Sequence, residues 1–277
     1  MKNDFKTPEL SVSDLTQSLY EVSKKLQQAN RDLQAHEEDM ALFYANISHD
    51  LRSPITAISN GIEYLQSNED NISKGELHDT LKVMSERTKY LTQLINDIFL
   101  MASLDTPSLS VHTEPVNLRF FLEDYFYMNQ VDVAYEGCDL ELKLSDAFIE
   151  LNPFVMLDPH LIARALDNLF TNAVKYCDDK PKIILGADII DDGSLVVFVR
   201  DNGIGIDAKN IEKIFDRGYR VDASRTPGAD NGCGFGLSIV KSIVECHGGS
   251  ITCESTLGEG TEFRTVFSID RHTGTLG

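Results

Sequence analysis

The sequence predicts a multidomain protein in which a long helical part, with a coiled coil and a helical hairpin, precedes an α/β sandwich. Three observations support this fold class. Apolar residues recur at heptad spacing from Leu15 to Ala102, short strand-like runs and helices follow Pro115, and residues 105–115 separate the two patterns. The chain of 277 residues is long enough for two modest domains and a linker.

The first heptad pattern predicts a coiled-coil helix, because its strict spacing does not drift as the stripe of a single amphipathic helix does. Its seam consists of Leu15, Leu19, Val22, Leu26, Ala29, Leu33, His36, Met40, Phe43 and Ile47. A parallel dimer would bury this seam, and a single helix lying on a globular core is the alternative. We expect the helix to continue to Leu65 and to kink at Pro54, where one backbone donor is missing.

The polar residues 67–75 predict a loop, and a second heptad pattern follows from Leu77 to Ala102 and ends at Thr106-Pro107. Two helices joined by a short loop form a hairpin, and two hairpins from two chains would form a dimeric four-helix bundle. We therefore expect a coiled-coil helix over residues 1–39, a dimerisation domain over 40–108 and an α/β domain over 109–277.

The α/β part contains alternating helix and strand patterns. Helices are expected near Leu118–Asn129, Pro159–Tyr176 and Phe235–Cys246. Strands are expected at Leu140–Leu144, Phe154–Leu157, Ile183–Asp188, Leu195–Arg200, Ser250–Glu254 and Glu262–Ile269, with a turn at Asp191-Asp-Gly193. Strands with three helices of this kind predict a sheet whose helices cover one face.

Composition excludes several classes of protein. The 44 acidic against 25 basic residues give a net charge of −19, which repels nucleic acid and anionic lipid surfaces, so we expect neither as a partner. Five cysteines without a C-x-x-C pair argue against a disulfide framework or a zinc ribbon and fit a reducing cytosol. With no apolar run long enough for a bilayer span, we expect a cytoplasmic protein or the inner portion of a longer membrane receptor.

The segment Ser48-His-Asp-Leu-Arg-Ser-Pro54 places a histidine outside the heptad seam, where its imidazole should face solvent. Neutral imidazole is a competent nucleophile near neutral pH, and Asp50 can accept the Nδ1 proton of His49. By itself this segment is weak evidence, because an exposed histidine beside an aspartate is usually only solvated.

The segment Asn168-Leu-Phe-Thr-Asn-Ala-Val-Lys-Tyr176 places two asparagines one helical turn apart. Asn172 can offer a neutral oxygen to Mg²⁺, Lys175 can neutralise phosphate charge and Tyr176 can lie against a base. A polar helix face that ends in a capping lysine is the alternative.

Two glycine-rich segments suit a bound nucleotide. In Asp201-Asn-Gly203-Ile-Gly205-Ile206, the glycines allow close backbone approach and the carboxylate at the strand end can accept a hydrogen bond from an exocyclic amine. In Gly232-Cys-Gly234-Phe-Gly236-Leu237, the free N–H groups of a helix start suit a polyphosphate. Ordinary turns and helix starts also contain such segments, and neither the Rossmann glycine spacing nor a Walker lysine is present.

The order of these motifs resembles that of the sensor histidine kinases of two-component systems, over about residues 40–270. Ser48–Pro54 resembles the H-box of that family, Asn168–Tyr176 the N-box, Asp201–Ile206 the G1 motif and Gly232–Gly236 the G2 motif, and Phe215 lies in the F-box. The α/β part would then have the Bergerat ATP-binding fold.

The resemblance implies a role for each matching residue. His49 would accept the phosphoryl group of ATP, Asp50 would act as acid and base, and Ser53 occupies the position that orients water for phosphatase activity. Asn172 would bind Mg²⁺ with help from Asn168. The remaining ATP-binding residues would be Lys175, Tyr176, Asp201, Gly203, Gly205, Phe215, Arg217, Arg220, Gly232, Gly234, Gly236 and Leu237, although Arg217 and Arg220 are equally well explained as solvated charges.

The resemblance also implies partners. The kinase would be a homodimer that passes its phosphoryl group from His49 to an aspartate of a response-regulator receiver domain. Two alternatives stay open at this point. One is an ATPase or serine kinase of the same fold that never phosphorylates His49, and the other is a degenerate kinase that serves as a dimeric scaffold.

Overall fold

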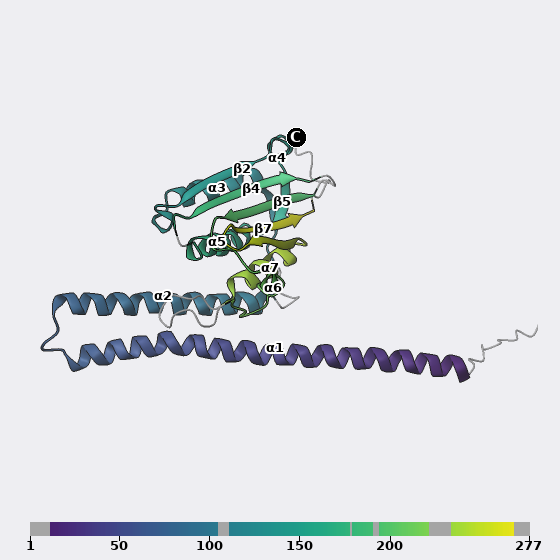
Figure 1. Cartoon of the computed structure of the whole chain (residues 1–277), viewed down its shortest axis with the longest axis horizontal. Helices are drawn as coiled ribbons and strands as arrows, with labels where there is room; N and C mark the ends of the chain where they lie inside the picture. The colour runs from purple at the N-terminus through teal and green to yellow at the C-terminus, as the bar shows by residue number, and fades with distance from the viewer. Residues whose placement is uncertain (1–11, 105–110, 178, 191–193, 222–233, 269–277) are drawn as a thin grey trace, which may run out of the picture. The chain divides into compact units, whose positions relative to one another are not determined.

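The computed structural model describes residues 12–104, 111–177, 179–190, 194–221 and 234–268. The chain divides into two compact units, Met1–Arg52 and Ser53–Gly277, each with its own network of internal contacts. The expected order of a helical part followed by an α/β sandwich is confirmed (Figure 1).

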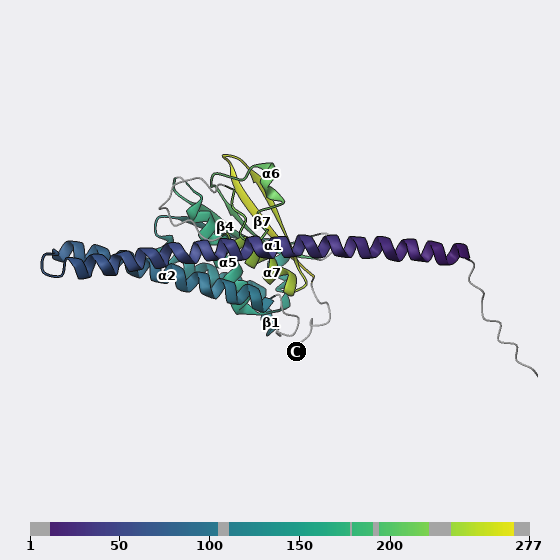
Figure 2. The same ribbon diagram turned by 90° about the horizontal axis from the view of Figure 1, so that it is seen from below.

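The helical part consists of α1 (Val12–Ser67) and α2 (Lys74–Leu104). α1 runs without interruption through Pro54, as the heptad pattern predicts (Figure 2). Ser73 begins α2 with a reciprocal cap: its Oγ accepts the Glu76 N–H at 3.2 Å while the Glu76 carboxylate accepts the Ser73 N–H at 3.0 Å. Gly61 lets the end of α1 approach α2 closely, since a Cβ there would lie 2.8 Å from Met84 Cγ.

The α/β part is built on a five-stranded sheet of order β2-β4-β5-β7-β6. β2 and β4 are parallel, and the other pairs are antiparallel. The strands are β2 (Asp139–Leu144), β4 (Lys182–Ile189), β5 (Leu195–Asp201), β6 (Ser250–Thr256) and β7 (Gly260–Phe267). The expected strands are therefore present, with ends that differ by a few residues.

Three helices share one apolar layer with a single face of this sheet, as the sequence predicts (Figure 1). They are α3 (Leu118–Gln130), α5 (Pro159–Lys175) and α7 (Gly236–Cys246). The core between them is fully buried at Leu122, Phe170, Leu185 and Ile239. Burial of these side chains, each worth about 1.5–3 kcal/mol, fixes the helices against the sheet.

Several short elements were not expected from the sequence. β1 (Glu114–Asn117) pairs antiparallel in a separate two-stranded sheet with β3 (Phe154–Leu157), the strand that was expected at these residues. A 3₁₀ turn at Val133–Tyr135, α4 (Asp146–Leu151) and α6 (Ala208–Ile211) complete the architecture. The residues predicted to end the second helix (106–107), to form the turn at 191–193 and to end the last strand (Ile269) lie outside the described residues.

Candidate functional site

The exposed histidine lies on α1, in the first of the two units. The side chain of His49 is 80% exposed, which confirms the expectation that it faces solvent. Its Nδ1 lies 3.2 Å from Oδ1 of Asp50, whose side chain is only 15% exposed. This contact favours the tautomer with the proton on Nδ1, which leaves the Nε2 lone pair available as a nucleophile. Ser53 is exposed four residues further along the same helix.

α5 begins at a strong N-cap. Asp158 accepts the N–H groups of His160 and Leu161 at 3.0 and 3.2 Å, and Pro159 occupies the first turn, where its missing donor does no harm. The apolar positions Ile162, Leu166, Leu169, Phe170 and Ala173 are all buried. The remaining face therefore carries the polar residues of the motif.

The two asparagines of α5 present unsatisfied polar groups. Asn168 Nδ2 is buried and has no hydrogen-bond partner among the described residues. The side-chain amide of Asn172, half-buried one turn later, likewise makes no hydrogen bond within the described ranges. A buried amide without a partner is rare in a folded protein and indicates that a ligand or water satisfies it. Gly236 lies against Asn168, since a Cβ on that glycine would lie 3.4 Å from Asn168 Oδ1.

The C-terminal end of α5 gathers positive charge around an aromatic ring. Lys175 Nζ lies 5.4 Å from the ring centroid of Tyr176, a cation–π contact. Burial raises the pKa of the Tyr176 hydroxyl, and the nearby Arg220 guanidinium lowers it. Arg220, which follows β5 by about twenty residues, thus lies within electrostatic range of the end of α5.

Asp201 is held at the end of β5 by two backbone donors. Its Oδ1 accepts the N–H of Gly203 at 2.8 Å and that of Thr261 at 3.2 Å. Among the described residues no donor reaches Oδ2, which is therefore open to a ligand. Burial raises the pKa of this carboxyl group, although both hydrogen bonds lower it.

The glycines after Asp201 permit contacts that no other residue allows. A Cβ on Gly203 would lie 2.6 Å from the carbonyl oxygen of Tyr176, which also accepts the Ile204 N–H at 2.9 Å. Gly205 has φ +69°, and a Cβ there would lie 2.0 Å from the carbonyl oxygen of Thr256. The loop that carries Asp201 is therefore fastened directly to the end of α5.

Gly234, two residues before α7, packs against residues 218–220. Gly234 has φ +73°, and a Cβ there would lie 2.8 Å from the carbonyl oxygen of Tyr219. Phe215 packs edge-on against Phe263 of β7, with ring centroids 6.3 Å apart. The structure thus brings the following predicted residues together: Asn168, Lys175, Tyr176, Asp201, Gly203, Gly205, Arg220, Gly234 and Gly236. Asn172 lies on α5 between Asn168 and Tyr176, and Phe215 packs on β7. Arg217 and Leu237 are half-buried in the same segments, and Gly232 lies outside the described residues.

A neighbouring cavity cannot hold the phosphates of a nucleotide. It has a volume of about 220 Å³ and is lined by Asp201 and by Glu254, Glu259 and Glu262. Its only cation, Arg200, is already paired with Glu262. Carboxylates repel phosphate, so this cavity is not suited to a polyphosphate, and the cations Lys175 and Arg220 are not among its lining residues.

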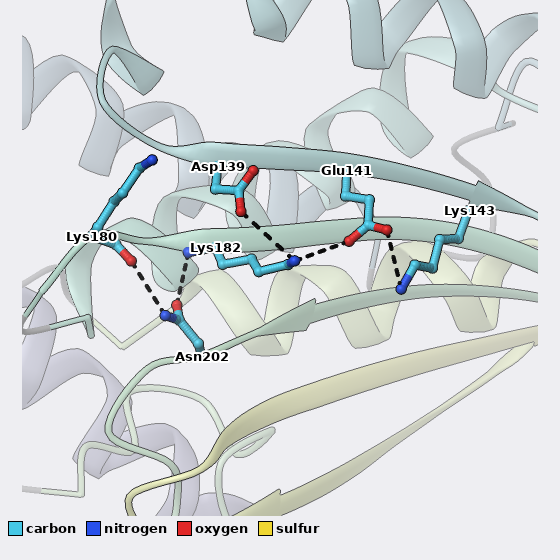
Figure 3. A network of polar contacts seen from close by, with 6 residues as sticks. All are labelled: Asp139, Glu141, Lys143, Lys180, Lys182 and Asn202. Atoms are coloured by element: carbon cyan, nitrogen blue, oxygen red, sulfur yellow. Dashed lines mark hydrogen bonds and ion pairs between the residues drawn. The ribbon is translucent and has the colours of Figure 1, made fainter.

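Asn202 was not singled out from the sequence, although it sits inside the Asp201–Ile206 motif. Its Oδ1 accepts the Lys182 N–H at 2.7 Å and its Nδ2 donates to the Lys180 carbonyl at 3.2 Å, which fixes the start of β4 (Figure 3). On the same strand the Lys182 ammonium bridges two carboxylates of β2, Glu141 at 3.2 Å and Asp139 at 3.7 Å. Hydrogen bonds from Lys182 and Lys143 lower the pKa of Glu141.

The described residues contain no group of three or more His, Cys, Asp or Glu side chains able to hold a metal ion. Within the same ranges, none of the helices has the length and apolar character required to cross a membrane.

Comparison with known proteins matches both parts of the chain to families. Residues 39–107 match the His Kinase A (phospho-acceptor) domain. Residues 157–271 match the family of histidine kinase-, DNA gyrase B- and HSP90-like ATPases. Together these two domains define a phosphotransfer protein of the histidine kinase type.

Curated relatives agree with this class. The chain is 33% identical over 228 residues to the sensor protein kinase WalK of Staphylococcus saprophyticus, with 81% of this chain and 36% of the relative covered. It is 33% identical over 223 residues to the sensor protein SrrB of Staphylococcus aureus, with 80% and 36% covered. The chain belongs to the sensor histidine kinases of two-component systems, and it spans about a third of the length of these relatives.

Solved structures share the fold. The histidine kinase ThkA, in complex with the response regulator protein TrrA, superposes with a TM-score of 0.65 at 19% identity, covering 92% of this chain and 68% of that one. The histidine kinase AdeS of Acinetobacter baumannii superposes with a TM-score of 0.60 at 18% identity, covering 80% and 98%.

Proposed function

We propose that this chain is a protein-histidine kinase that transfers the γ-phosphoryl group of ATP to His49 and then to an aspartate of a response regulator. The observation that carries the proposal is the contact of the end of α5, at Lys175 and Tyr176, with the Asp201 loop and its glycine turns. The membership of the family and the exposed His49–Asp50 pair support it.

The adenine base would lie between the end of α5 and the Asp201 loop. The open Oδ2 of Asp201 accepts the exocyclic N–H of the base, and the hydrogen bonds to Oδ1 hold the carboxylate in place for it. Gly203 lets the Asp201 loop pack directly against the Tyr176 carbonyl, and the half-exposed Tyr176 ring would cover the base.

The phosphates would lie toward the cations at the end of α5. Lys175, Arg217 and Arg220 supply positive charge in a chain that is otherwise strongly acidic. The backbone N–H groups at the start of α7, at Gly236 and Leu237, would point the positive end of that helix at the phosphates. Phe215 packs on Phe263 and so holds its own segment, residues 215–220, against β7.

A magnesium ion fits this site, because Asn172 offers an unpaired amide oxygen and Mg²⁺ prefers hard oxygen ligands with several retained waters. Asn172 would hold the ion, and the buried Asn168 amide would hydrogen-bond to one of its waters. When bound, the ion supplies neutralisation of the phosphate charge. Asn172 and Asn168 orient the phosphate chain relative to Lys175.

The chemistry at His49 follows from its exposure and its partner. The Nε2 lone pair attacks the γ-phosphorus, the bond from that phosphorus to the bridging oxygen breaks, and ADP leaves. Asp50 holds the Nδ1 proton and stabilises the charge that develops on the ring. The phosphoryl group then passes to the carboxylate of a receiver domain. Ser53, exposed on the same helix, would orient a water molecule that hydrolyses the phosphoryl group from the regulator.

The kinase would act as a homodimer. Leu19, Val22, Leu26 and Leu33 are each more than half exposed along α1, and a second copy of the chain would bury them in a coiled coil. We propose the domain limits 1–39 for this coiled coil, 40–108 for the dimerisation and phosphotransfer domain and 109–277 for the catalytic domain. The segment would work in the cytoplasm, where ATP and receiver domains are available.

Incubation with γ-labelled ATP and Mg²⁺ tests this function. The expected label is acid-labile and base-stable, transfers to a receiver domain and is absent from His49→Gln. His78→Gln, a change at a histidine of α2, is the matched control and should label normally. Acid-stable label, or label that persists in His49→Gln, would instead indicate a serine kinase of the same fold. Binding of ATP without any label would indicate an ATPase.

A further inference from the structure

Two half-buried cysteines lie at the edge of the candidate nucleotide site and take no part in the proposed reaction. Cys177 follows Tyr176 directly at the end of α5. Its thiol donates weakly to the carbonyl oxygen of Asp179 at 3.4 Å and to Oδ1 of Asn202 at 3.5 Å. The thiol therefore touches the residue that follows Asp201 in the G1-like loop.

Cys138 comes directly before β2, at the same end of the sheet. Its N–H donates to the Tyr135 carbonyl at 3.0 Å, and the Tyr135 ring packs edge-on against Phe170 of α5, with centroids 5.8 Å apart. The side chain of Asp139 is on the open face of the sheet, where it pairs with Lys182 (Figure 3). Cys138 precedes Asp139 directly, so its backbone lies at the start of the β2–β4 ladder, close to Lys182.

A shared set of contacts places Cys138 and Cys177 at the same end of the sheet, around Lys182 and Asn202. Asp139 pairs with Lys182 in the parallel β2–β4 ladder, and the Lys182 N–H donates to the same Asn202 oxygen that Cys177 contacts. Burial raises the pKa of Cys138, and the negative charge of an ionised Cys177 raises it further. The two sulfur atoms are thus within electrostatic range of each other.

We propose that Cys138 and Cys177 form a reversible disulfide under a two-electron oxidant such as hydrogen peroxide, and that this disulfide weakens nucleotide binding. The second part of this proposal, that the disulfide weakens nucleotide binding, rests on the proposed function. In the first step a thiolate attacks peroxide, the O–O bond breaks, and a sulfenic acid and hydroxide form. In the second step the other sulfur displaces the sulfenic oxygen, which leaves as water, so two thiols and one peroxide give one disulfide and two waters.

The disulfide would reach the nucleotide through α5 and the Asp201 loop. Bridged cysteines hold their Cα atoms about 5.5 Å apart, so the bond fixes Cys177 toward β2 and removes its thiol from Asn202. Tyr176 and Lys175 precede Cys177 directly, and the Tyr176 carbonyl is packed against Gly203. A displacement of Cys177 therefore moves the groups proposed to hold the base and the phosphates.

The test uses the full chain with Cys233, Cys246 and Cys253 changed to Ser, so that only the pair remains. After treatment with peroxide, mass spectrometry of an unreduced digest should find the Cys138 and Cys177 peptides linked. The affinity for a fluorescent ATP analogue should fall about tenfold, the effect of losing one hydrogen bond to a charged acceptor. A thiol reductant should restore it.

The single variants Cys138→Ser and Cys177→Ser, made in this background, should bind the analogue normally and lose all sensitivity to peroxide. The absence of linked peptides, sensitivity that persists in Cys138→Ser, or a disulfide without a change in affinity would each overturn the proposal. Failure of the reduced protein to bind the analogue would count against the nucleotide site itself, and the linked peptides would still report whether the disulfide forms.

Discussion

The proposed phospho-acceptor site and the proposed nucleotide site are built in opposite ways. His49, Asp50 and Ser53 are close because they lie on one helix, and the hydrogen-bond register of α1 alone sets their spacing. The nucleotide site draws its groups from α5, the end of β5, residues 215–220 and the start of α7, and close backbone contacts at glycines hold them together. A local site tolerates substitution around it, whereas an assembled site fails when one backbone contact is lost.

The largest effect is expected from Gly205→Ala. The new methyl group would lie 2.0 Å from the Thr256 carbonyl oxygen at a residue with φ +69°, so the Asp201 loop must move. We expect a loss of several kcal/mol of stability and loss of nucleotide binding, because a backbone clash adds to about 1–3 kcal/mol of conformational strain. Thermal unfolding and titration with an ATP analogue measure the two effects.

Gly258→Ala is the matched control for this prediction. Gly258 has φ +81°, but nothing lies within 4 Å of a Cβ there, so the substitution introduces the strain without the clash. It should cost about 1 kcal/mol and leave nucleotide affinity unchanged. Equal losses in the two variants would show that strain alone, and not the fastening of the loop to Thr256, accounts for the effect.

The next effect concerns the helical part. Leu19 and Tyr20 are 70% and 68% exposed in the single chain, but only Leu19 belongs to the heptad seam. Leu19→Asp should weaken dimerisation at least tenfold, because each chain loses the burial of one leucine, worth about 1.5–3 kcal/mol. Tyr20→Asp should not. Analytical ultracentrifugation compares the two, and equal dissociation constants would refute the coiled-coil seam. Nucleotide affinity should be unchanged in both variants.

The two sites also differ in how much of their structure can be predicted from the sequence. Heptad spacing predicts α1 through Pro54, and a helix of known register then places His49 in solvent beside Asp50. Short strand-like runs predict β3 and the five strands of the main sheet, but β1 was not predicted, because Pro115 marks a boundary as readily as an edge strand. The contacts of Asn202 and Cys177 were not predicted for a different reason. They join segments that are distant in the sequence, and no local sequence pattern encodes such contacts.

A smaller effect is expected from pH, through Asp201. Burial raises the pKa of its carboxyl above the ordinary value of 3.8. Its charge therefore costs stability at neutral pH, and this cost is relieved as pH falls through the raised pKa. The affinity for nucleotide changes with pH in the opposite direction to stability, because only the ionised carboxylate presents an unprotonated Oδ2 to the base. Affinity should fall as pH drops through that raised pKa, and below the pKa by up to about tenfold per pH unit.

Asp201→Asn separates this titration from a general effect of acid. The amide keeps an oxygen for the Gly203 and Thr261 N–H groups, but it cannot ionise. Its affinity should be lower at neutral pH, by about 1.5–3 kcal/mol for one hydrogen bond to a charged group, and it should stay flat as pH falls. If wild type and variant lose affinity in parallel, Asp201 is not the titrating group.

The smallest effect tests whether the helical part is as tolerant as its local construction implies. Ser73→Ala removes the hydroxyl that caps the Glu76 N–H, and the helix start should lose about 1 kcal/mol. Thr92→Ala is the control, since its hydroxyl only donates to the Thr88 carbonyl within the same helix and should be nearly neutral. Urea unfolding of both variants measures the difference. This cap touches no residue of the proposed nucleotide site, so labelling at His49 should persist in both variants. A loss of labelling in Ser73→Ala alone would show that the loop before α2 acts on the reaction and not only on the helix.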